Sequence, residues 1–300
     1  MTELRGAVEL GGTKVIAAVG RAGEEPLARE RIPTTDPGET LDRVVGFFRA
    51  RAAEGRSISA LGVGCFGPVD LDPDSPRWGF ITSTPKLRWQ GTDVAGTLGR
   101  ALGVPVGFDT DVNAAALAEY RLGAARGLDP AVYLTVGTGI GGGAVVNGKL
   151  LHGSAHPEMG HMLVSRRGDD AFQGSCPFHG SCWEGMASGP AVEARWGRRG
   201  EDLSPGHPAW DLEAWYLAQG IVNLLMVLSP RAVILGGGIA QVPGLIDRVR
   251  SSAASLCAEY LDRPRSPGEW ADRIRAPGLE IPGLTGAFLL AEDAAVSSAS

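Results

Sequence analysis

The sequence predicts an α/β protein built from two lobes. Two observations support this prediction: strands and helices alternate along the chain, and an apolar strand–glycine turn–strand unit occurs twice. The length of 300 residues is enough for one large domain or for two lobes. A ligand site is expected in a cleft between such lobes.

The first half of the chain opens on an apolar, β-branched segment interrupted by the turn GGTK (11–14). Leu41, Val44, Val45 and Phe48 then recur at helical spacing, and LGVGCFGPVDL is an apolar run that ends in a Gly-Pro turn. The predicted elements are strand–turn–strand over 7–20, a helix over 38–54, a strand within 61–71 that runs into a Gly-Pro turn, a long loop with short strands over 72–93, a strand over 104–108 and a helix over 109–123.

The second half begins with AVYLTVGTGIGGGAVVNGKLL, which has the layout of the first glycine-turn unit and indicates a duplicated fold. The segment RAVILGGGIA predicts another strand that runs into a glycine turn. The predicted helices of this half begin near Trp183 and near residue 282, and cover 211–228 and 242–262.

Composition excludes several classes of partner. A net charge of −6 without any long basic run argues against nucleic-acid binding. No apolar run reaches transmembrane length and the N-terminus has no signal-peptide pattern, so no membrane partner and a cytoplasmic location are expected. Disulfides are not expected in that compartment, which leaves Cys176 and Cys182 as metal ligands or as packing residues.

Three glycine turns each follow an apolar strand: LGGTK, GTGIGGG and LGGGIA. Such a turn exposes backbone amides, and glycine lets the backbone approach a phosphate closely. One turn alone is usually structural, whereas three in one chain indicate a nucleotide. GTGIGG fits the dinucleotide pattern G-x-G-x-x-G but leads into the strand-like AVV instead of a helix, and no Walker pattern occurs.

The stretch SCPFHGSCWEG (175–185) places Cys176, His179 and Cys182 within seven positions. Two thiols and an imidazole at this spacing suit tetrahedral Zn²⁺, which needs a fourth ligand. Spacing alone leaves the fourth ligand open, because four of the five histidines, His152, His156, His161 and His179, lie in this region.

Eight motifs, taken together, resemble the ROK family of sugar kinases and repressors, and among its branches the fructokinases. They run through nearly the whole chain in the expected order: ELGGTK (9–14), FGPVDL (66–71), ITSTPKLRW (81–89), DTDVNAAALAE (109–119), TVGTGIGGG (135–143), HPEMGH (156–161), CPFHGSCWEGMASGPAVEARWG (176–197) and ILGGGI (234–239). The resemblance implies an actin/hexokinase-like fold of two ribonuclease-H-like lobes around a cleft. We expect an N-terminal lobe over 1–112, completed by a helix at about 284–300, and a C-terminal lobe over 113–283 that carries the zinc segment.

The resemblance also implies the residues that bind ATP and act on the sugar. The expected ATP-binding residues are Gly11, Gly12, Thr13, Lys14, Gly137, Thr138, Gly139, Gly236, Gly237 and Gly238. Asp111 is the expected general base; without the resemblance it would be a helix cap. A carboxylate can align a sugar hydroxyl and take its proton as the phosphoryl group arrives. Mg²⁺ would bridge the ATP phosphates, with Glu9 and Asp111 as the nearby acids.

For zinc, the resemblance selects His161 as the fourth ligand beside Cys176, His179 and Cys182. His161 could then bind the metal through one ring nitrogen and donate to a sugar oxygen from the other. Glu158 and Glu184 are expected to accept hydrogen bonds from sugar hydroxyls. The zinc would therefore be structural and would hold two sugar-binding segments together.

The expected activity is ATP-dependent phosphorylation of D-fructose to fructose 6-phosphate. Thr110 stands where many glucose-specific relatives have Asn, which favours fructose; a broad manno/glucokinase and a catalytically silent sugar sensor remain alternatives. A repressor is not expected, because the first phosphate turn begins near residue 9 and leaves no room for a DNA-binding module. Relatives are commonly dimers, so a homodimer is expected. Lys86, in the TPK segment, is interpreted as a salt-bridge partner within a loop.

Overall fold

The computed structural model describes residues 3–298. Contacts divide the chain into two compact units. Unit 1 comprises Met1–Ala118, Leu150–Pro157 and Leu279–Ser300, and unit 2 comprises Glu119–Lys149 and Glu158–Gly278. The predicted boundary after residue 112 falls inside a helix, and the short segment 150–157 returns to unit 1, which the sequence did not indicate.

Unit 1 is organised around a five-stranded mixed sheet with the order β3-β2-β1-β4-β5. The first three strands form an antiparallel meander, and β4 and β5 add to β1 in parallel. The strands are β1 (Leu4–Leu10), β2 (Lys14–Gly20), β3 (Ala28–Pro33), β4 (Ile58–Cys65) and β5 (Val106–Thr110).

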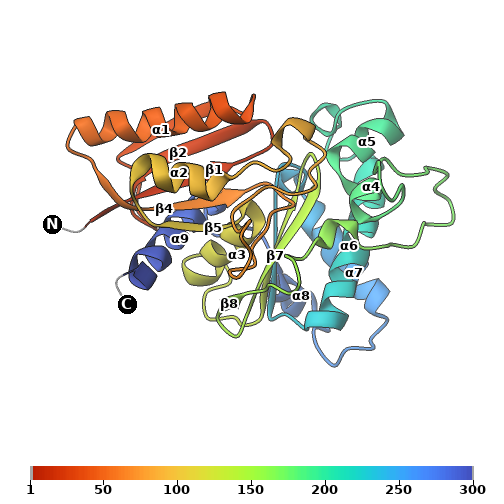
Figure 1. Ribbon diagram of the computed structural model, residues 1–300. Helices are drawn as coiled ribbons and strands as arrows, with labels where there is room; N and C mark the ends of the chain where they lie inside the picture. Colours follow the sequence, from red (N-terminus) through yellow and green to blue (C-terminus); the bar gives the residue numbers. More distant parts are fainter. Residues whose placement is uncertain (1–2, 299–300) are drawn as a thin grey trace. The chain divides into compact units, whose positions relative to one another are not determined.

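Helices cover both faces of this sheet (Figure 1). On one face α1 and α2 bury a core that includes Val44, Phe48 and Leu98 against the strands. On the other face lie α3 and the C-terminal helix α9, drawn in dark blue beneath the red and orange strands. The helical segments are α1 (Pro37–Ala53), η1 (Leu87–Trp89), α2 (Val94–Leu102), α3 (Asp111–Arg121, which runs on into unit 2) and α9 (Pro282–Ser298).

Glycines let α9 lie directly on the backbone of unit 1. A Cβ at Gly62 of β4 would overlap the carbonyl oxygen of Ala287, and a Cβ at Gly107 of β5 would overlap that of Leu290. Gly286 of α9 approaches Ala114 of α3 in the same way. Because any larger side chain would force these elements apart, the three glycines fix how α3 and its first residue are held.

Unit 2 contains a second sheet, with the order β10-β9-β6-β7-β8. β6 and β7 are antiparallel, whereas β9 and β10 add to β6 in parallel, so this sheet repeats the topology of the first. The strands are β6 (Ala131–Val136), β7 (Ile140–Val146), β8 (Lys149–Leu150), β9 (Ala232–Gly236) and β10 (Ile274–Arg275). The repeat confirms the duplicated α/β fold that the two glycine turns indicated.

The helices of unit 2 include the long α6, whose residues Trp210, Tyr216 and Leu217 are fully buried. The helices are α4 (Trp183–Ala187), α5 (Gly189–Trp196), α6 (Ala209–Leu228), α7 (Leu245–Cys257) and α8 (Pro267–Arg273), with short 3₁₀ turns η2 (Met159–His161), η3 (Gly200–Asp202) and η4 (Ile239–Gln241).

Several elements differ from the sequence prediction. The predicted loop over 72–93 ends where α2 begins, and neither α2 nor β3 was predicted. The helix predicted over 242–262 is confined to α7, because Ala258 and Glu259 adopt positive φ and end it. The C-terminal helix was expected to reach residue 300, and its last two positions lie outside the described residues. Within residues 3–298, no helix combines the length and apolar character needed to span a membrane.

Candidate functional site

The first glycine turn joins β1 to β2 in unit 1. Gly11 N donates to Lys14 O at 3.0 Å, which closes the turn, and Thr34 Oγ1 donates to Gly11 O at 2.7 Å from the neighbouring segment. Within residues 3–298, the amides of Gly12 and Thr13 have no acceptor. The turn therefore presents two unpaired N–H groups, which is what a bound phosphate requires.

Glu9 is the penultimate residue of β1, and its carboxylate occupies the space beside Gly283 at the start of α9. A Cβ at Gly283 would come within 2.8 Å of Glu9 Oε1. Burial raises the pKa of Glu9, and the positive charge of Lys14 partly opposes this shift. Because burial outweighs the effect of Lys14, a cation bound beside Glu9 would be needed to keep its carboxylate ionised.

Asp111 is the first residue of α3 and directly follows β5. Thr110 caps the helix: its Oγ1 accepts from Asn113 N at 3.1 Å, and its side chain is buried. Gly64 of β4 allows the close approach, because a Cβ there would lie 3.3 Å from the Asp111 Cα atom. Burial raises the pKa of the neighbouring Cys65 thiol, and the charge of Asp111 raises it further.

A buried polar network lies beside Asp111. Asp109, which is 2% exposed, accepts hydrogen bonds from Thr110 N at 2.7 Å and from Asn113 Nδ2 at 2.7 Å. Its other oxygen lies 2.8 Å from His152 Nε2, and this hydrogen bond raises the pKa of His152. The Asp109 carboxylate therefore ties the end of β5 to the first turn of α3 and to the segment 150–157.

The second glycine turn joins β6 to β7 in unit 2. Gly137 N donates to Gly139 O at 2.9 Å, and within the described residues Thr138 N and Gly139 N have no acceptor. Glu184 of α4 contacts this turn: its Oε2 accepts from Ile140 N at 3.0 Å, and a Cβ at Gly139 would lie 2.5 Å from the same oxygen. One carboxylate oxygen of Glu184 is thus committed to the turn.

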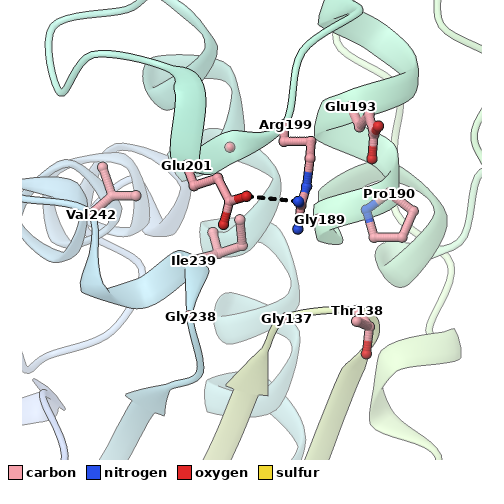
Figure 2. Close-up of a pocket in the computed structure, with 11 residues that line it drawn as sticks. Gly137, Thr138, Gly189, Pro190, Glu193, Arg199, Glu201, Gly238, Ile239 and Val242 are labelled. Atoms are coloured by element: carbon pink, nitrogen blue, oxygen red, sulfur yellow. Dashed lines mark ion pairs between the residues drawn. The ribbon is translucent and has the colours of Figure 1, made fainter. Parts of the chain in front are cut away.

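A cavity of about 360 Å³ opens next to the second turn (Figure 2). Its floor carries Gly137 and Thr138 from the second turn and Gly238 and Ile239 from the third. Gly189, Pro190 and Glu193 of α5 line one side, and Arg199, Gly200, Glu201 and Val242 complete the lining. Arg199 and Glu201 form an ion pair of 2.8 Å, seen in Figure 2 as a dashed line.

Of the three glycines in the third turn, Gly238 is the one that lines the cavity. Gly236 is a packing position, because a Cβ there would come within 2.6 Å of the Tyr133 hydroxyl. Gly237 has φ +87° and faces the Val136 carbonyl, so only glycine suits it. Gly236 and Gly237 therefore determine the packing and conformation of the turn, and Gly238 faces the cavity.

The four predicted zinc ligands come together in unit 2. One ligand atom from each of His161, Cys176, His179 and Cys182 lies within 4.8 Å of all the others. Cys176 Sγ is 3.8 Å from both His161 Nδ1 and His179 Nδ1, and Cys182 Sγ is 3.6 Å from His161 Nδ1. Tetrahedral zinc, with Zn–S about 2.3 Å and Zn–N about 2.0–2.1 Å, requires N···S edges of about 3.6 Å. The donor set and spacing therefore fit zinc.

The local fold explains how these ligands converge. His161 ends η2, while Cys176 and His179 lie in a tight turn closed by Gly180 N donating to Cys176 O at 2.9 Å. Cys182 caps α4 and is fully buried. Burial raises the pKa of Cys182 to about 11, helped by the Cys176 thiol, so a bound cation would be needed to stabilise the thiolate.

Both histidines turn Nδ1 towards the sulfurs, which leaves His161 Nε2 for a different partner. Glu158 is exposed and directly precedes η2. Within unit 2 the structure thus brings the zinc ligands close to Glu184 and the second turn, since Glu184 is two residues after Cys182. Asp111 and the first turn lie together in unit 1.

Sequence reasoning missed several residues that the structure brings to these places. Glu193, Arg199 and Glu201 line the cavity, although only Glu193 lies in a recognised motif. The Ser-Gly-Pro start of α5, where Ser188 Oγ accepts from Ala191 N, was a detectable helix-start signal. Asp109 and Asn113 lie in the recognised motif 109–119, but nothing in the sequence indicated that Asp109 meets His152, because that pair depends on a tertiary contact.

Comparison with known proteins identifies the family. A model of the ROK family matches residues 5–294. A putative fructokinase of Bacillus subtilis (strain 168) is 43% identical over 98% of this chain and 97% of its own length. A fructokinase of Zymomonas mobilis is 43% identical over 96% of each chain. A ROK family glucokinase from Streptomyces griseus, solved in complex with glucose and AMPPNP, superposes with a TM-score of 0.77 at 28% identity, covering 97% of this chain and 99% of that one.

Two sheets of one topology, each with a glycine turn after its first strand, define an α/β protein of the actin and hexokinase type, as predicted. Within that class, this chain belongs to the ROK family.

Proposed function

We propose that this protein transfers the terminal phosphoryl group of ATP to the 6-hydroxyl of D-fructose. The observation that carries the proposal is the 43% identity, over almost the full chain, to proteins named fructokinase. The site residues support it: two glycine turns present unpaired amides, a cavity adjoins the second and third turns, and Asp111 stands at the start of a capped helix.

Asp111 is the proposed general base. Its carboxylate accepts the proton of the 6-hydroxyl as the sugar oxygen bonds to the γ-phosphorus, and the bond to the β,γ-bridging oxygen breaks to release ADP. Asp109 and Thr110 hold the strand-to-helix junction that orients Asp111. Base catalysis of this kind contributes roughly 10²–10⁴-fold to the rate.

The glycine turns hold the nucleotide in this proposal. The Gly12 and Thr13 amides with Lys14, and the Thr138 and Gly139 amides, donate to phosphate oxygens. The cavity lined by Gly238, Ile239 and Val242 takes the adenosine, because it combines an apolar wall with polar groups at its rim. Magnesium, when bound with ATP, neutralises phosphate charge; Glu9 and Asp111 are the acids that would hold it through water.

Zinc has a structural role in the proposal. His161, Cys176, His179 and Cys182 hold it, and the closed four-ligand set leaves no position for a reacting water. By fixing η2 and the start of α4, the metal orients His161 Nε2, Glu158 and Glu184 towards sugar hydroxyls. We also propose a homodimer in the cytoplasm, where ATP is supplied.

Thr110 bears on the choice of sugar. Its hydroxyl caps α3 and its side chain is buried, so this position offers no long polar arm to a pyranose hydroxyl. A chain specific for glucose would need such an arm from elsewhere, which favours fructose over glucose.

A coupled ADP-release assay with Mg·ATP and a panel of fructose, mannose, glucose and N-acetylated hexoses tests the proposal. Fructose should lead in kcat/KM by tenfold or more, about 1.4 kcal/mol of transition-state preference. A higher kcat/KM for mannose or glucose would change the proposed substrate and leave the proposed mechanism intact. No turnover on any sugar by folded, zinc-loaded protein would favour the silent sugar sensor.

A further inference from the structure

We propose that Lys86 is a second phosphate-binding lysine of the first glycine turn, and that its ammonium contacts the terminal phosphates of the bound nucleotide. The proposal rests on the kinase function proposed above and adds to it a residue from a loop distant in the sequence.

Lys86 lies across the first turn. A Cβ built on Gly12 would stand 2.7 Å from Lys86 Cε and 3.6 Å from Lys86 Nζ, so the end of the lysine side chain fills the space that a side chain at position 12 would take. Its ammonium therefore stands over the same turn that presents the unpaired amides of Gly12 and Thr13. A cation and two free N–H donors at one turn form a site for an anion.

The sequence-based interpretation of Lys86 as a salt-bridge partner is not supported. Lys86 is exposed, and no carboxylate within residues 3–298 forms an ion pair with it. A cation held over this turn without an acidic side chain beside it can pair with an anion that the substrate brings. The charge is then available to stabilise phosphate oxygens without first breaking an internal ion pair.

The loop that carries Lys86 is fixed relative to the turn. Trp89, which is 2% exposed, donates from its backbone N to Lys86 O at 2.8 Å and from its indole Nε1 to Thr35 O at 2.9 Å. The neighbouring Thr34 donates to Thr13 O at 3.1 Å and, from its hydroxyl, to Gly11 O. A short series of hydrogen bonds thus connects the backbone of Lys86 to the turn itself, which preorganises the lysine.

The distribution of lysine along the chain also supports a phosphate-binding role for Lys86. Of the 28 basic Lys and Arg residues only three are lysines, and two of these, Lys14 and Lys86, stand at the first turn. The chain thus uses arginine almost everywhere that a surface cation suffices. Lysine provides a compact charge with three donors on a narrow stem, which suits a space as small as that over Gly12.

The test uses the full chain and compares Lys86→Met, which keeps the stem and removes the charge, with Lys86→Arg and Lys149→Met. Lys149 is the matched control, because it is an exposed lysine on β8 that belongs to unit 2, whereas the first turn belongs to unit 1. Two readouts are needed: steady-state kinetics with Mg·ATP and fructose, and equilibrium affinities for ATP, ADP and AMP without sugar. Thermal midpoints show whether each variant is folded.

We expect Lys86→Met to lower kcat/KM for ATP by about 10- to 100-fold, the range for one charged hydrogen bond. Its affinity for ATP should fall more than its affinity for AMP, Lys86→Arg should recover part of the loss, and Lys149→Met should match the wild type. A merely structural role would lower all three affinities together.

The proposal is overturned if folded Lys86→Met keeps wild-type kcat/KM and ATP affinity, or if AMP affinity falls equally. A failure of the kinase function is distinguishable: a wild type that phosphorylates no hexose yet loses ATP affinity selectively on Lys86→Met would refute the activity and retain the lysine site. A wild type that binds no nucleotide would refute both.

Discussion

The two glycine turns occupy equivalent places in two sheets of the same strand order, but opposite charges lie beside them. In the first turn the space over Gly12 is filled by the end of Lys86, and in the second the space over Gly139 is filled by the Glu184 carboxylate. Lys86 has no acidic partner among residues 3–298, whereas Glu184 accepts from Ile140 N at 3.0 Å.

This difference indicates that the two copies of the duplicated turn have different functions. The first turn keeps its cations available, which suits contact with the most charged part of a nucleotide. The second turn has given one N–H to Glu184, and Glu184 follows Cys182 by two residues on the start of α4. The second turn is therefore coupled to the Cys/His cluster and to the proposed sugar ligands. The first turn is instead coupled to Thr34 and, through Thr35, to the Trp89 loop.

The largest expected effect concerns the proposed general base, Asp111. Asp111→Asn keeps the size of the side chain and removes its basicity, so kcat should fall by roughly 10²–10⁴ while KM for ATP changes little. Steady-state kinetics with fructose measure both constants, and the thermal midpoint should stay near that of the wild type. Phosphorylation at a near wild-type rate would mean that Asp111 is not the general base.

Removal of the metal should act on the second turn. Cys182→Ala should abolish the binding of about one zinc per chain and lower kcat/KM for fructose, because α4 and Glu184 lose their anchor. Cys257→Ala is the matched control: it also removes a buried thiol, from α7, and should keep the metal. Elemental analysis of the wild type and of both purified variants measures the zinc content. Zinc that is retained by Cys182→Ala, or an active wild type without zinc, would contradict the assignment of the zinc ligands.

Alanine at the two turns separates their roles directly. Gly12 and Gly139 both lack positive φ, so alanine adds bulk without backbone strain. At Gly139 it must displace Glu184 and leave the Ile140 amide unpaired, at a cost of about 1–3 kcal/mol of unfolding free energy. At Gly12 it displaces only the flexible end of Lys86, so stability should change by less than about 0.5 kcal/mol.

Urea unfolding of Gly12→Ala and Gly139→Ala measures these free energies. Equal losses would show that Lys86 is as firmly integrated as Glu184, and the contrast between the turns would then fail.

The smallest effect concerns the network that supports Asp111. The hydrogen bond to Asp109 raises the folded-state pKa of His152, so the protonated imidazole contributes stability below its unfolded pKa of about 6.5 and loses it as pH rises through the folded pKa. The difference in unfolding free energy between wild type and His152→Gln should therefore be largest at acid pH and shrink towards alkaline pH. A difference that grows with pH has the wrong sign for this account.

Local signals explain what the sequence could predict. Glycine turns after apolar strands, the Cys-His-Cys spacing and the helical repeat of Val44, Val45 and Phe48 are all visible within a few residues. The Cys/His cluster needed one step more, since His161 was chosen by resemblance. The structure places the Nδ1 atom of His161 beside both sulfurs.

What could not be predicted depends on contacts between distant segments. Lys86 stands over Gly12 only because Trp89 and Thr34 bring their loops to the first turn, and His152 meets Asp109 only because the segment 150–157 belongs to unit 1. The cavity residues Arg199 and Glu201 are ordinary surface charges in the sequence, and their place at the cavity follows from the fold of η3.

The most direct measurement is to identify the product. The purified protein with Mg·ATP and D-fructose should yield one phosphorylated sugar, whose nuclear magnetic resonance spectrum places the phosphate on carbon 6, with one ADP formed for each sugar. Phosphate on carbon 1, or ATP consumed without a sugar phosphate, would contradict the account.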